Sequence, residues 1–122
     1  MTLTIAAPIA RVWQALIDPD VVALWSALDP VFLPPGYPAA GQHAIWADHG
    51  ALLHDWIVAV EPSRKLVSRL AMGPWQVNEE YALVPRGNRS TVLRAIWSGH
   101  PKLVENGAGM RRLKNWCERA PS

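Results

Sequence analysis

The spacing of apolar residues near the N-terminus changes from that of a strand to that of a helix. Leu3 and Ile5 lie two positions apart, which predicts a short strand over residues 2–6 with one apolar face. Pro8 then favours the start of a helix, because the N–H that proline lacks has no partner in a first turn. Apolar residues follow at the spacing of one helical face: Ile9, Val12, Trp13 and Leu16.

A second short helix and a loop are predicted next. Asp18-Pro19 ends the first helix, since proline disfavours helical backbone in the residue before it. Asp20 can cap a second helix, whose apolar residues are Val21, Leu24, Trp25 and Leu28. Residues 30–41 hold four prolines and two glycines, and we expect them to form a loop within the domain.

The middle of the chain reads as a succession of strands separated by turn residues. The predicted strands cover residues 42–47, 52–60, 65–72, 75–84 and 91–98. Their hairpin spacing indicates an antiparallel meander. Residues 103–119 return to a helical period, with a shared face formed by Asn106, Met110, Leu113 and Cys117.

This order predicts an α+β fold in a single domain over residues 1–122. A curved antiparallel sheet of about six strands would wrap on a long C-terminal helix, and two short helices would follow the first strand. The amphipathic last helix is the obvious cover for the apolar face of the sheet.

The composition is that of a folded chain with an unusual aromatic content. Half of the residues are hydrophobic and 18% are charged, and there are seven Trp beside two Tyr and one Phe. The single cysteine, Cys117, excludes a disulfide scaffold and a multi-cysteine zinc site. No apolar run is long enough to span a membrane and the N-terminus has no signal-peptide pattern, so we expect a cytoplasmic protein without a membrane partner.

The charges are unevenly distributed along the chain. Residues 1–60 hold one base, Arg11, and five acids, whereas residues 61–122 hold eleven bases and five acids. The bases are scattered over predicted strands, turns and the last helix, and no motif of a nucleic-acid-binding module is present. We therefore expect no nucleic-acid partner.

Several motifs, taken in order, resemble the START-like (SRPBCC) superfamily, the helix-grip fold of the birch-pollen allergen. Within it the chain is most similar to the family named after the activator of the ninety-kilodalton heat-shock-protein ATPase. The entry from strand to helix carries the resemblance in Ile5-Ala6-Ala7-Pro8, Val12-Trp13-Gln14-Ala15-Leu16, Asp18-Pro19 and Trp25. Two later hairpins carry it in Val60-Glu61-Pro62, Lys65-Leu66-Val67, Glu80-Tyr81-Ala82-Leu83-Val84-Pro85, Thr91 and Ser98-Gly99. In the last helix, Gly109-Met110 stands where the family usually has Gly-Trp, with Leu113 beyond it.

The resemblance implies a cavity between the curved sheet and the last helix, usually occupied by an apolar or aromatic small molecule. Four tryptophans lie on predicted strands, where they either fill the core or line such a cavity and stack on a flat ligand. The predicted ligand-binding residues are Trp46, His54, Trp56, Trp75, Tyr81, Trp97, Met110 and Leu113.

Three side chains are candidates for acid–base chemistry. His54 shares the more apolar face of its strand with Leu52, Trp56, Val58 and Val60, and could move a proton if that face meets the cavity. Glu79 and Tyr81 share a face of the strand over residues 75–84. The simpler interpretation makes His54 a core or rim residue, and pairs Glu79 with Arg69 or Arg94 on a neighbouring strand.

Other chemistries lack their motifs. The spacing of His43, His49 and His54 matches no zinc signature, and Asp48-His49-Gly50 is explained as turn chemistry, so no metal site is expected. No nucleophile elbow, phosphate loop or dinucleotide fingerprint is present, and no cofactor is expected.

Three functions remain open at this point. The first is binding of a small hydrophobic or aromatic ligand, and the second is a cyclase, aromatase or dehydratase that uses His54, Glu79 or Tyr81. The third is an interaction module similar to a chaperone ATPase activator. An uncovered sheet edge and apolar surface could in addition support a homodimer.

Overall fold

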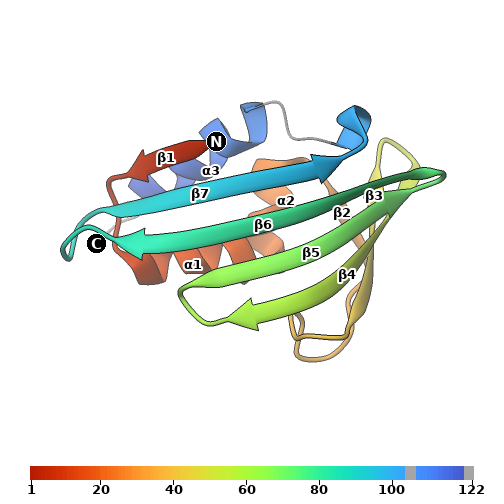
Figure 1. The fold of residues 1–122 in the computed structure, drawn as a ribbon, viewed down its shortest axis with the longest axis horizontal. Helices are drawn as coiled ribbons and strands as arrows, with labels where there is room; N and C mark the ends of the chain where they lie inside the picture. The colour runs from red at the N-terminus through yellow and green to blue at the C-terminus, as the bar shows by residue number, and fades with distance from the viewer. Residues whose placement is uncertain (104–106, 120–122) are drawn as a thin grey trace.

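The computed structural model describes residues 1–103 and 107–119, and its strands form one seven-stranded antiparallel sheet (Figure 1). The sheet order is β1-β7-β6-β5-β4-β3-β2. The strands are β1 (Thr2–Ile5), β2 (Asp29–Phe32), β3 (His43–Asp48), β4 (Ala51–Glu61), β5 (Lys65–Met72), β6 (Trp75–Pro85) and β7 (Thr91–Gly99). Strands β3 to β7 form the predicted meander, and β1 returns to pair with β7.

The strand that the sequence analysis did not predict is β2, which overlaps the segment expected to be a loop. In β2, Pro30 pairs with Trp46 and Phe32 with Ile45. Proline is tolerated there because β2 is an edge strand, whose outer N–H groups have no neighbouring strand to bond. The proline content therefore masked a strand that only its position at the edge makes acceptable.

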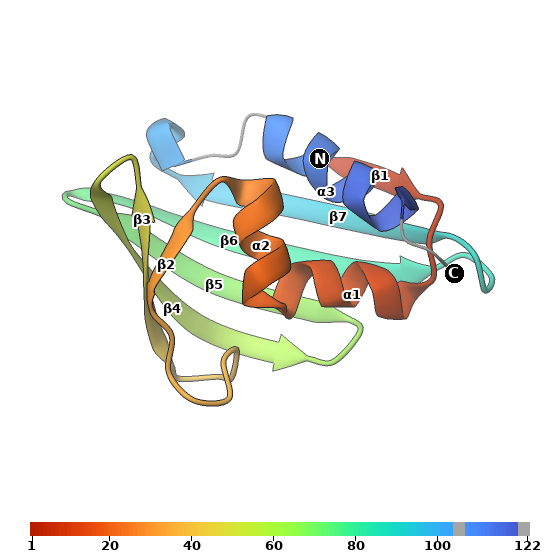
Figure 2. The ribbon, with the colours of Figure 1, turned by 180° about the vertical axis from the view of Figure 1, so that it is seen from behind.

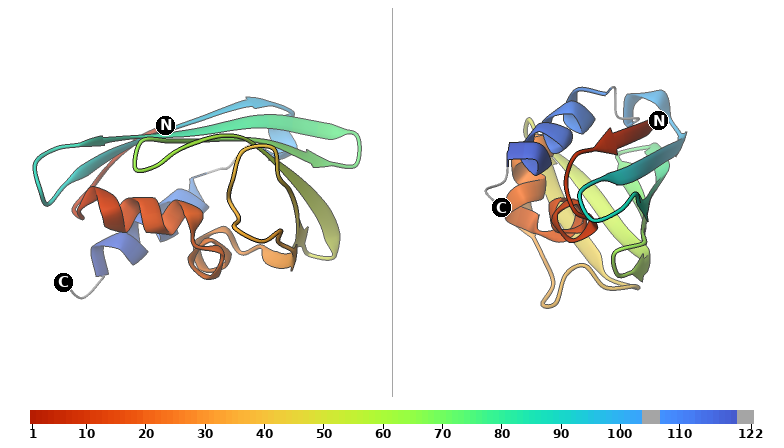
Figure 3. Two further views of the ribbon diagram at one scale, coloured as in Figure 1. Left: turned by 90° about the horizontal axis from the view of Figure 1, so that it is seen from below. Right: turned by 90° about the vertical axis from the view of Figure 1, so that its left-hand side faces the viewer.

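Three α-helices cover one face of the sheet, as Figures 2 and 3 show from behind and from below. They are α1 (Ile9–Ile17), α2 (Pro19–Ser26) and α3 (Ala108–Arg119), and a short 3₁₀ turn, η1 (Pro101–Leu103), precedes α3. The predicted pair of short helices is confirmed. The cap of α2 differs from the expectation: Asp18, not Asp20, is the N-cap, and its carboxylate accepts the Asp20 N–H at 3.0 Å.

The last helix is shorter than predicted and lies toward one side of the sheet. It packs against α1, α2 and β1, and its buried residues are Gly109, Met110, Leu113 and Cys117. Lys114 donates to the carbonyl of Thr4 at 2.7 Å, and Glu118 accepts the N–H of Ala6 at 2.8 Å. The predicted face is confirmed for its last three members, while Asn106 lies outside the described residues.

The core fills the space between the helices and the sheet, mostly on the β1-β7-β6 side, and reaches Ile57 of β4 and Leu66 of β5. Strand alternation directs Ile5, Leu93, Ala95 and Leu83 into it, and each of these is buried. The sheet extends beyond this core on the side of β3, β4 and β5, and there α2 is the helix that faces it (Figure 2). This part of the fold holds the candidate site.

Candidate functional site

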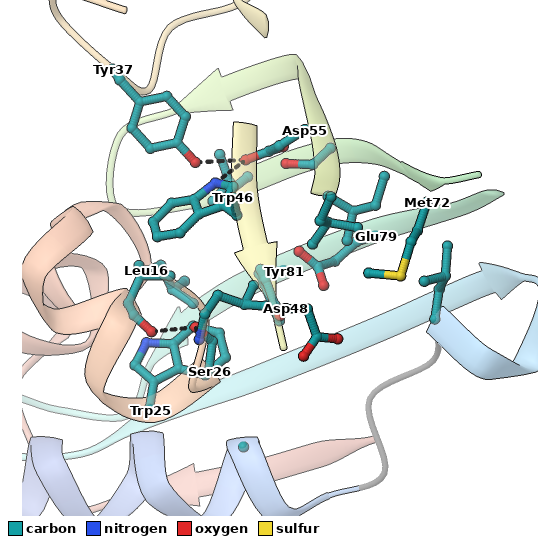
Figure 4. Close-up of a pocket in the computed structure, with 18 residues that line it drawn as sticks. Leu16, Trp25, Ser26, Tyr37, Trp46, Asp48, Asp55, Met72, Glu79 and Tyr81 are labelled. Carbon is teal, nitrogen blue, oxygen red and sulfur yellow. Dashed lines mark hydrogen bonds between the residues drawn. The ribbon is translucent and has the colours of Figure 1, made fainter. Parts of the chain in front are cut away.

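A cavity of about 220 Å³ lies between α2 and the inner face of the sheet. Strands β3 to β6 form its floor, α2 and the loop before β3 form its walls, and α3 contributes only Gly109 (Figure 4). The lining residues are Leu16, Val22, Trp25, Ser26, Leu28, Tyr37, Trp46, Asp48, Leu53, Asp55, Leu66, Ser68, Leu70, Met72, Glu79, Tyr81, Leu103 and Gly109. The family resemblance implied a cavity between the sheet and the last helix. In the structure the cavity lies between the sheet and α2 instead.

A buried carboxylate, Asp55 on β4, is the most unusual group in this lining. It is 6% exposed, and its Oδ2 accepts two hydrogen bonds, from the hydroxyl of Tyr37 at 2.7 Å and from the indole N–H of Trp46 at 3.3 Å (Figure 4). Its other oxygen, Oδ1, is buried and has no hydrogen-bond partner. Such an acceptor costs free energy unless a donor satisfies it.

Burial sets the protonation of this pair. Loss of hydration raises the pKa of Asp55 above its ordinary value of 3.8, and the hydrogen bonds from Tyr37 and Trp46, the nearby Ser68 hydroxyl and the charge of His43 oppose that rise. The Ser68 hydroxyl nevertheless makes no bond of hydrogen-bonding geometry with Oδ1. Burial, together with the adjacent Asp55 charge, raises the pKa of Tyr37 well above its ordinary range. Tyr37 therefore keeps its proton and serves as a donor to Asp55.

The loop that carries Tyr37 is held against β4 by the backbone and by one side chain. Gly41 donates to the carbonyl of Ile57 at 2.8 Å, and Ile57 donates back to Gln42 at 2.9 Å. The Gln42 side chain accepts the N–H of Ala39 and donates to the carbonyl of Pro35, each at 2.9 Å. These bonds fix the loop, so that the Tyr37 hydroxyl is positioned over the cavity floor.

A second polar group and a row of aromatic rings form the β6 side of the cavity. The Glu79 carboxylate accepts the indole N–H of Trp97 at 2.8 Å. Tyr81 meets Trp97 and Trp25 edge-on, with ring centroids 6.2 and 6.4 Å apart. Trp25 itself donates to the carbonyl of Ala15 at 2.7 Å, which links α2 to α1. Trp25, one of the apolar residues of the predicted second helix, is thus a wall of the cavity.

The structure brings some predicted site residues together. Trp46, Glu79 and Tyr81 line the cavity, and Trp97 adjoins it through Glu79. Met110 and Leu113 are fully buried in the core beneath α3 instead. Trp75 stacks on His100 near the far end of β6, with ring centroids 5.2 Å apart.

The predicted placement of His54 and Trp56 at the cavity is wrong. Leu53, Asp55 and Ile57 are buried, and His54 and Trp56 lie on the opposite face of the sheet. The alternation made the face of His54 look more apolar, because a carboxylate interrupts the face that is in fact buried. That carboxylate is tolerated inside because Tyr37 and Trp46 hydrogen-bond it.

On the outer face, His54 and Trp56 belong to a stacked group with His43. His43 and Trp56 lie parallel at 4.6 Å, and a ring nitrogen of His43 lies 2.8 Å from one of His54. The Arg69 guanidinium lies 5.5 Å from the Trp56 ring, and neither Arg69 nor Arg94 is buried. Within residues 1–103 and 107–119, no group of three or more His, Cys, Asp or Glu is placed to hold a metal ion.

Asp55, Tyr37 and Ser68 are site residues that sequence reasoning missed. A signal for Asp55 exists, because an acid flanked two positions away by Leu53 and Ile57 is a polar residue on an otherwise apolar strand face. No local signal exists for Tyr37, which lies 18 positions from its partner in a loop of unpredictable path.

Comparison with known proteins identifies the fold. No protein-family model matches the chain, and no curated protein matches it by sequence. Among solved structures, protein MLL2253 from Mesorhizobium loti is similar, with a TM-score of 0.78 and 22% identity over the whole of both chains. The Aha1 dimer from Colwellia psychrerythraea gives a TM-score of 0.72 at 17% identity, over 100% of this chain and 96% of that one. CalU16 from Micromonospora echinospora gives 0.71 at 20% identity, over 99% of this chain and 74% of that one.

The chain has the helix-grip fold. Both the curved antiparallel sheet and the C-terminal helix match these structures, as the sequence motifs predicted, and Aha1 is among the similar proteins. Among the residues that the structure describes, no helix is long and apolar enough to cross a membrane.

Proposed function

We propose that the chain binds a small hydrophobic or aromatic molecule in the cavity between α2 and the sheet. The observation that carries the proposal is the cavity itself, about 220 Å³ in volume and lined by the aromatic rings of Trp25, Trp46, Tyr37 and Tyr81. For scale, an engineered apolar cavity of about 150 Å³ holds benzene. The space here suits one aromatic ring with a short substituent.

The nature of the lining supports ligand binding over simple core packing. Ligand pockets combine mostly apolar walls with a few placed polar groups, and Asp55 and Glu79 supply these here. A core built only for stability would exclude a carboxylate such as Asp55, because burying it costs more than burying a leucine.

A thermal-shift series tests this proposal with toluene, indole and phenol as probes, at concentrations up to their solubility. We expect a ligand-dependent rise in Tm, because a ligand that binds only the folded state stabilises it. Leu70→Trp should fill the cavity and abolish the rise, whereas Leu52→Trp, on an exposed outer position of β4, should leave it intact. No rise with any probe, or equal rises in both variants, would contradict the proposal.

An acid–base enzyme of the cyclase, aromatase or dehydratase kind is the second candidate. One observation favours it: two of the three predicted acid–base residues, Glu79 and Tyr81, line the same cavity. Asp55 is a further ionisable group in that lining. His54 lies on the other face of the sheet and takes no part. Turnover of an aromatic polyketide-like substrate by the wild-type chain, lost in Glu79→Gln, would support this candidate over pure binding.

The interaction-module hypothesis and the homodimer remain predictions, as does the cytoplasmic location. One of the similar structures is described as a dimer, and β2 leaves Val31 and Phe32 exposed at a sheet edge. Light scattering of the purified chain distinguishes a monomer from a dimer, and a pull-down with the chaperone tests the activator hypothesis.

A further inference from the structure

Three hydrogen-bond donors that line the cavity are already used within the protein. Trp25 donates to the carbonyl of Ala15 at 2.7 Å, and Trp46 and Tyr37 donate to Asp55 at 3.3 and 2.7 Å. Indole has a single N–H and a phenol a single O–H, so none of these three groups has a second proton to offer. A ligand that needs to accept a hydrogen bond therefore finds these donors spent.

One acceptor in the lining, by contrast, has no donor. Asp55 keeps a buried Oδ1 without a hydrogen-bond partner. The carboxylates of Glu79 and Asp48 lie in the same lining, and Asp48 is bonded by the exposed His49 at 2.8 Å. An ionised carboxylate accepts hydrogen bonds but has no proton to donate. The polar groups of this cavity therefore favour a ligand that brings donors.

The charged groups in the lining have one sign. Among the lining residues that the structure describes, Asp48, Asp55 and Glu79 are charged, and none is Lys, Arg or His. The remaining walls include two indoles and two phenols, whose ring faces attract a cation. Both features favour a positive ligand and disfavour a negative one.

We infer that this cavity selects a small aromatic amine, in its ammonium form, over an aromatic carboxylate of the same shape. The inference rests on the proposed function and narrows it to a ligand class. The ammonium group would lie toward the Asp55 side, where it supplies the donor that Oδ1 lacks, and the ring would lie against Trp25 and Tyr81. A carboxylate in that place would instead meet acids of its own charge and find no free indole or Tyr37 donor.

Three ligands of similar size separate the inference from the proposed function. Phenethylamine, phenethyl alcohol and phenylpropanoate would be titrated by calorimetry at neutral pH and low salt. We expect the amine to bind at least about tenfold more tightly than the carboxylate, with the alcohol between them, since charge-assisted hydrogen bonds are about twice as strong as neutral ones. If the alcohol binds but the carboxylate matches or exceeds the amine, the inference is overturned and the proposed function stands. If none of the three binds, both are overturned.

Removing one carboxylate from the cavity and one from outside it tests the assignment. Asp55→Asn keeps the shape and still accepts from Tyr37 and Trp46, and it should weaken phenethylamine binding about tenfold with the alcohol unchanged within twofold. Glu80→Gln makes the same charge change on the outer face, where Glu80 pairs with Lys65 at 3.7 Å, and should leave both affinities unchanged. Equal effects of the two variants on the amine would overturn the inference. Should Asp55→Asn not fold, the comparison of the three ligands on the wild-type chain still decides the inference.

Discussion

The bond between Tyr37 and Asp55 offers the sharpest test of how the site is held together. Tyr37→Phe removes the donor that lies 2.7 Å from Oδ2 and leaves the ring in place. A hydrogen bond to a charged, buried group contributes about 1.5–3 kcal/mol, so we expect the free energy of unfolding to fall by about 2 kcal/mol. With an unfolding entropy of about 2.1 cal/mol/K per residue, that loss lowers Tm by about 8 °C in a chain of 122 residues.

A double-mutant cycle isolates the charge-dependent part of this bond. In an Asp55→Asn background the acceptor is neutral, and Tyr37→Phe should cost only about 1 kcal/mol. Urea unfolding followed by far-ultraviolet circular dichroism would measure all four proteins at neutral pH, with unchanged m-values as the control for a common two-state transition. A coupling free energy of about 1 kcal/mol is expected. A value within about 0.3 kcal/mol of zero would refute the claim that Tyr37 stabilises an ionised Asp55.

Three further predictions concern other parts of the chain. Because burial raises the pKa of Asp55 above 3.8, the folded protein holds that proton more tightly than the unfolded chain does. Wild type should therefore gain stability relative to Asp55→Asn as pH falls from about 7 towards about 4. A constant difference between the urea midpoints of the two proteins across that range would contradict this. Cys117, with a pKa raised to about 11 by burial, should react with iodoacetamide at mildly alkaline pH only as fast as the protein unfolds, and rapid labelling of the native chain would disprove its burial. Gly99→Ala would place a Cβ 2.3 Å from the carbonyl oxygen of Gln76 and should lower Tm, whereas Gly87→Ala has open space around its Cβ and should lower Tm by less. A larger fall in Tm for Gly87→Ala than for Gly99→Ala would count against the β6–β7 geometry.

Local patterns predicted the elements of this fold better than their orientation. The two short helices are encoded by Pro8, Asp18-Pro19 and the spacing of Val12 and Leu16, all within one segment of the chain. The meander is likewise encoded by turns between neighbouring strands. Elements that depend only on nearby residues were therefore predictable, and so was the overall resemblance that rests on them.

The candidate site depends on partners far apart in sequence, and here the predictions were weaker. The residues of β4 alone do not show whether Asp55 or His54 faces inward, because the partner that a buried Asp55 needs, Tyr37, lies in a loop 18 positions away. The strand alternation separated Leu53, Asp55 and Ile57 from His54 and Trp56 correctly, but could not say which set the helices would cover. Beyond Ile57 a bulge shifts the alternation, so that Val60, expected on the face of His54, pairs with the buried Leu66 and packs against the core. A carboxylate in the buried set made the wrong choice look better on hydrophobicity alone.

The position of the cavity could not be predicted for a related reason. The sequence indicated that the last helix would cover the sheet, and α3 does so on the side of β1. The β3–β5 side is left to α2, whose eight residues place Trp25 in the wall. How far a helix reaches across a sheet depends on where its loop ends, which the pattern of apolar residues does not encode.

The seven tryptophans provide the most direct measurement of the central claim, that a ligand occupies the cavity against α2. Each indole N–H gives a separate signal in a ¹H–¹⁵N spectrum, and assignment by single Trp→Phe variants would identify those of Trp25 and Trp46 in the cavity and of Trp56 on the outer face. Titration with phenethylamine should shift the signals of Trp25 and Trp46 in a saturable way and leave that of Trp56 unmoved. Shifts confined to Trp56, or no saturable shift of Trp25 and Trp46 with this amine or with phenethyl alcohol, would contradict the account.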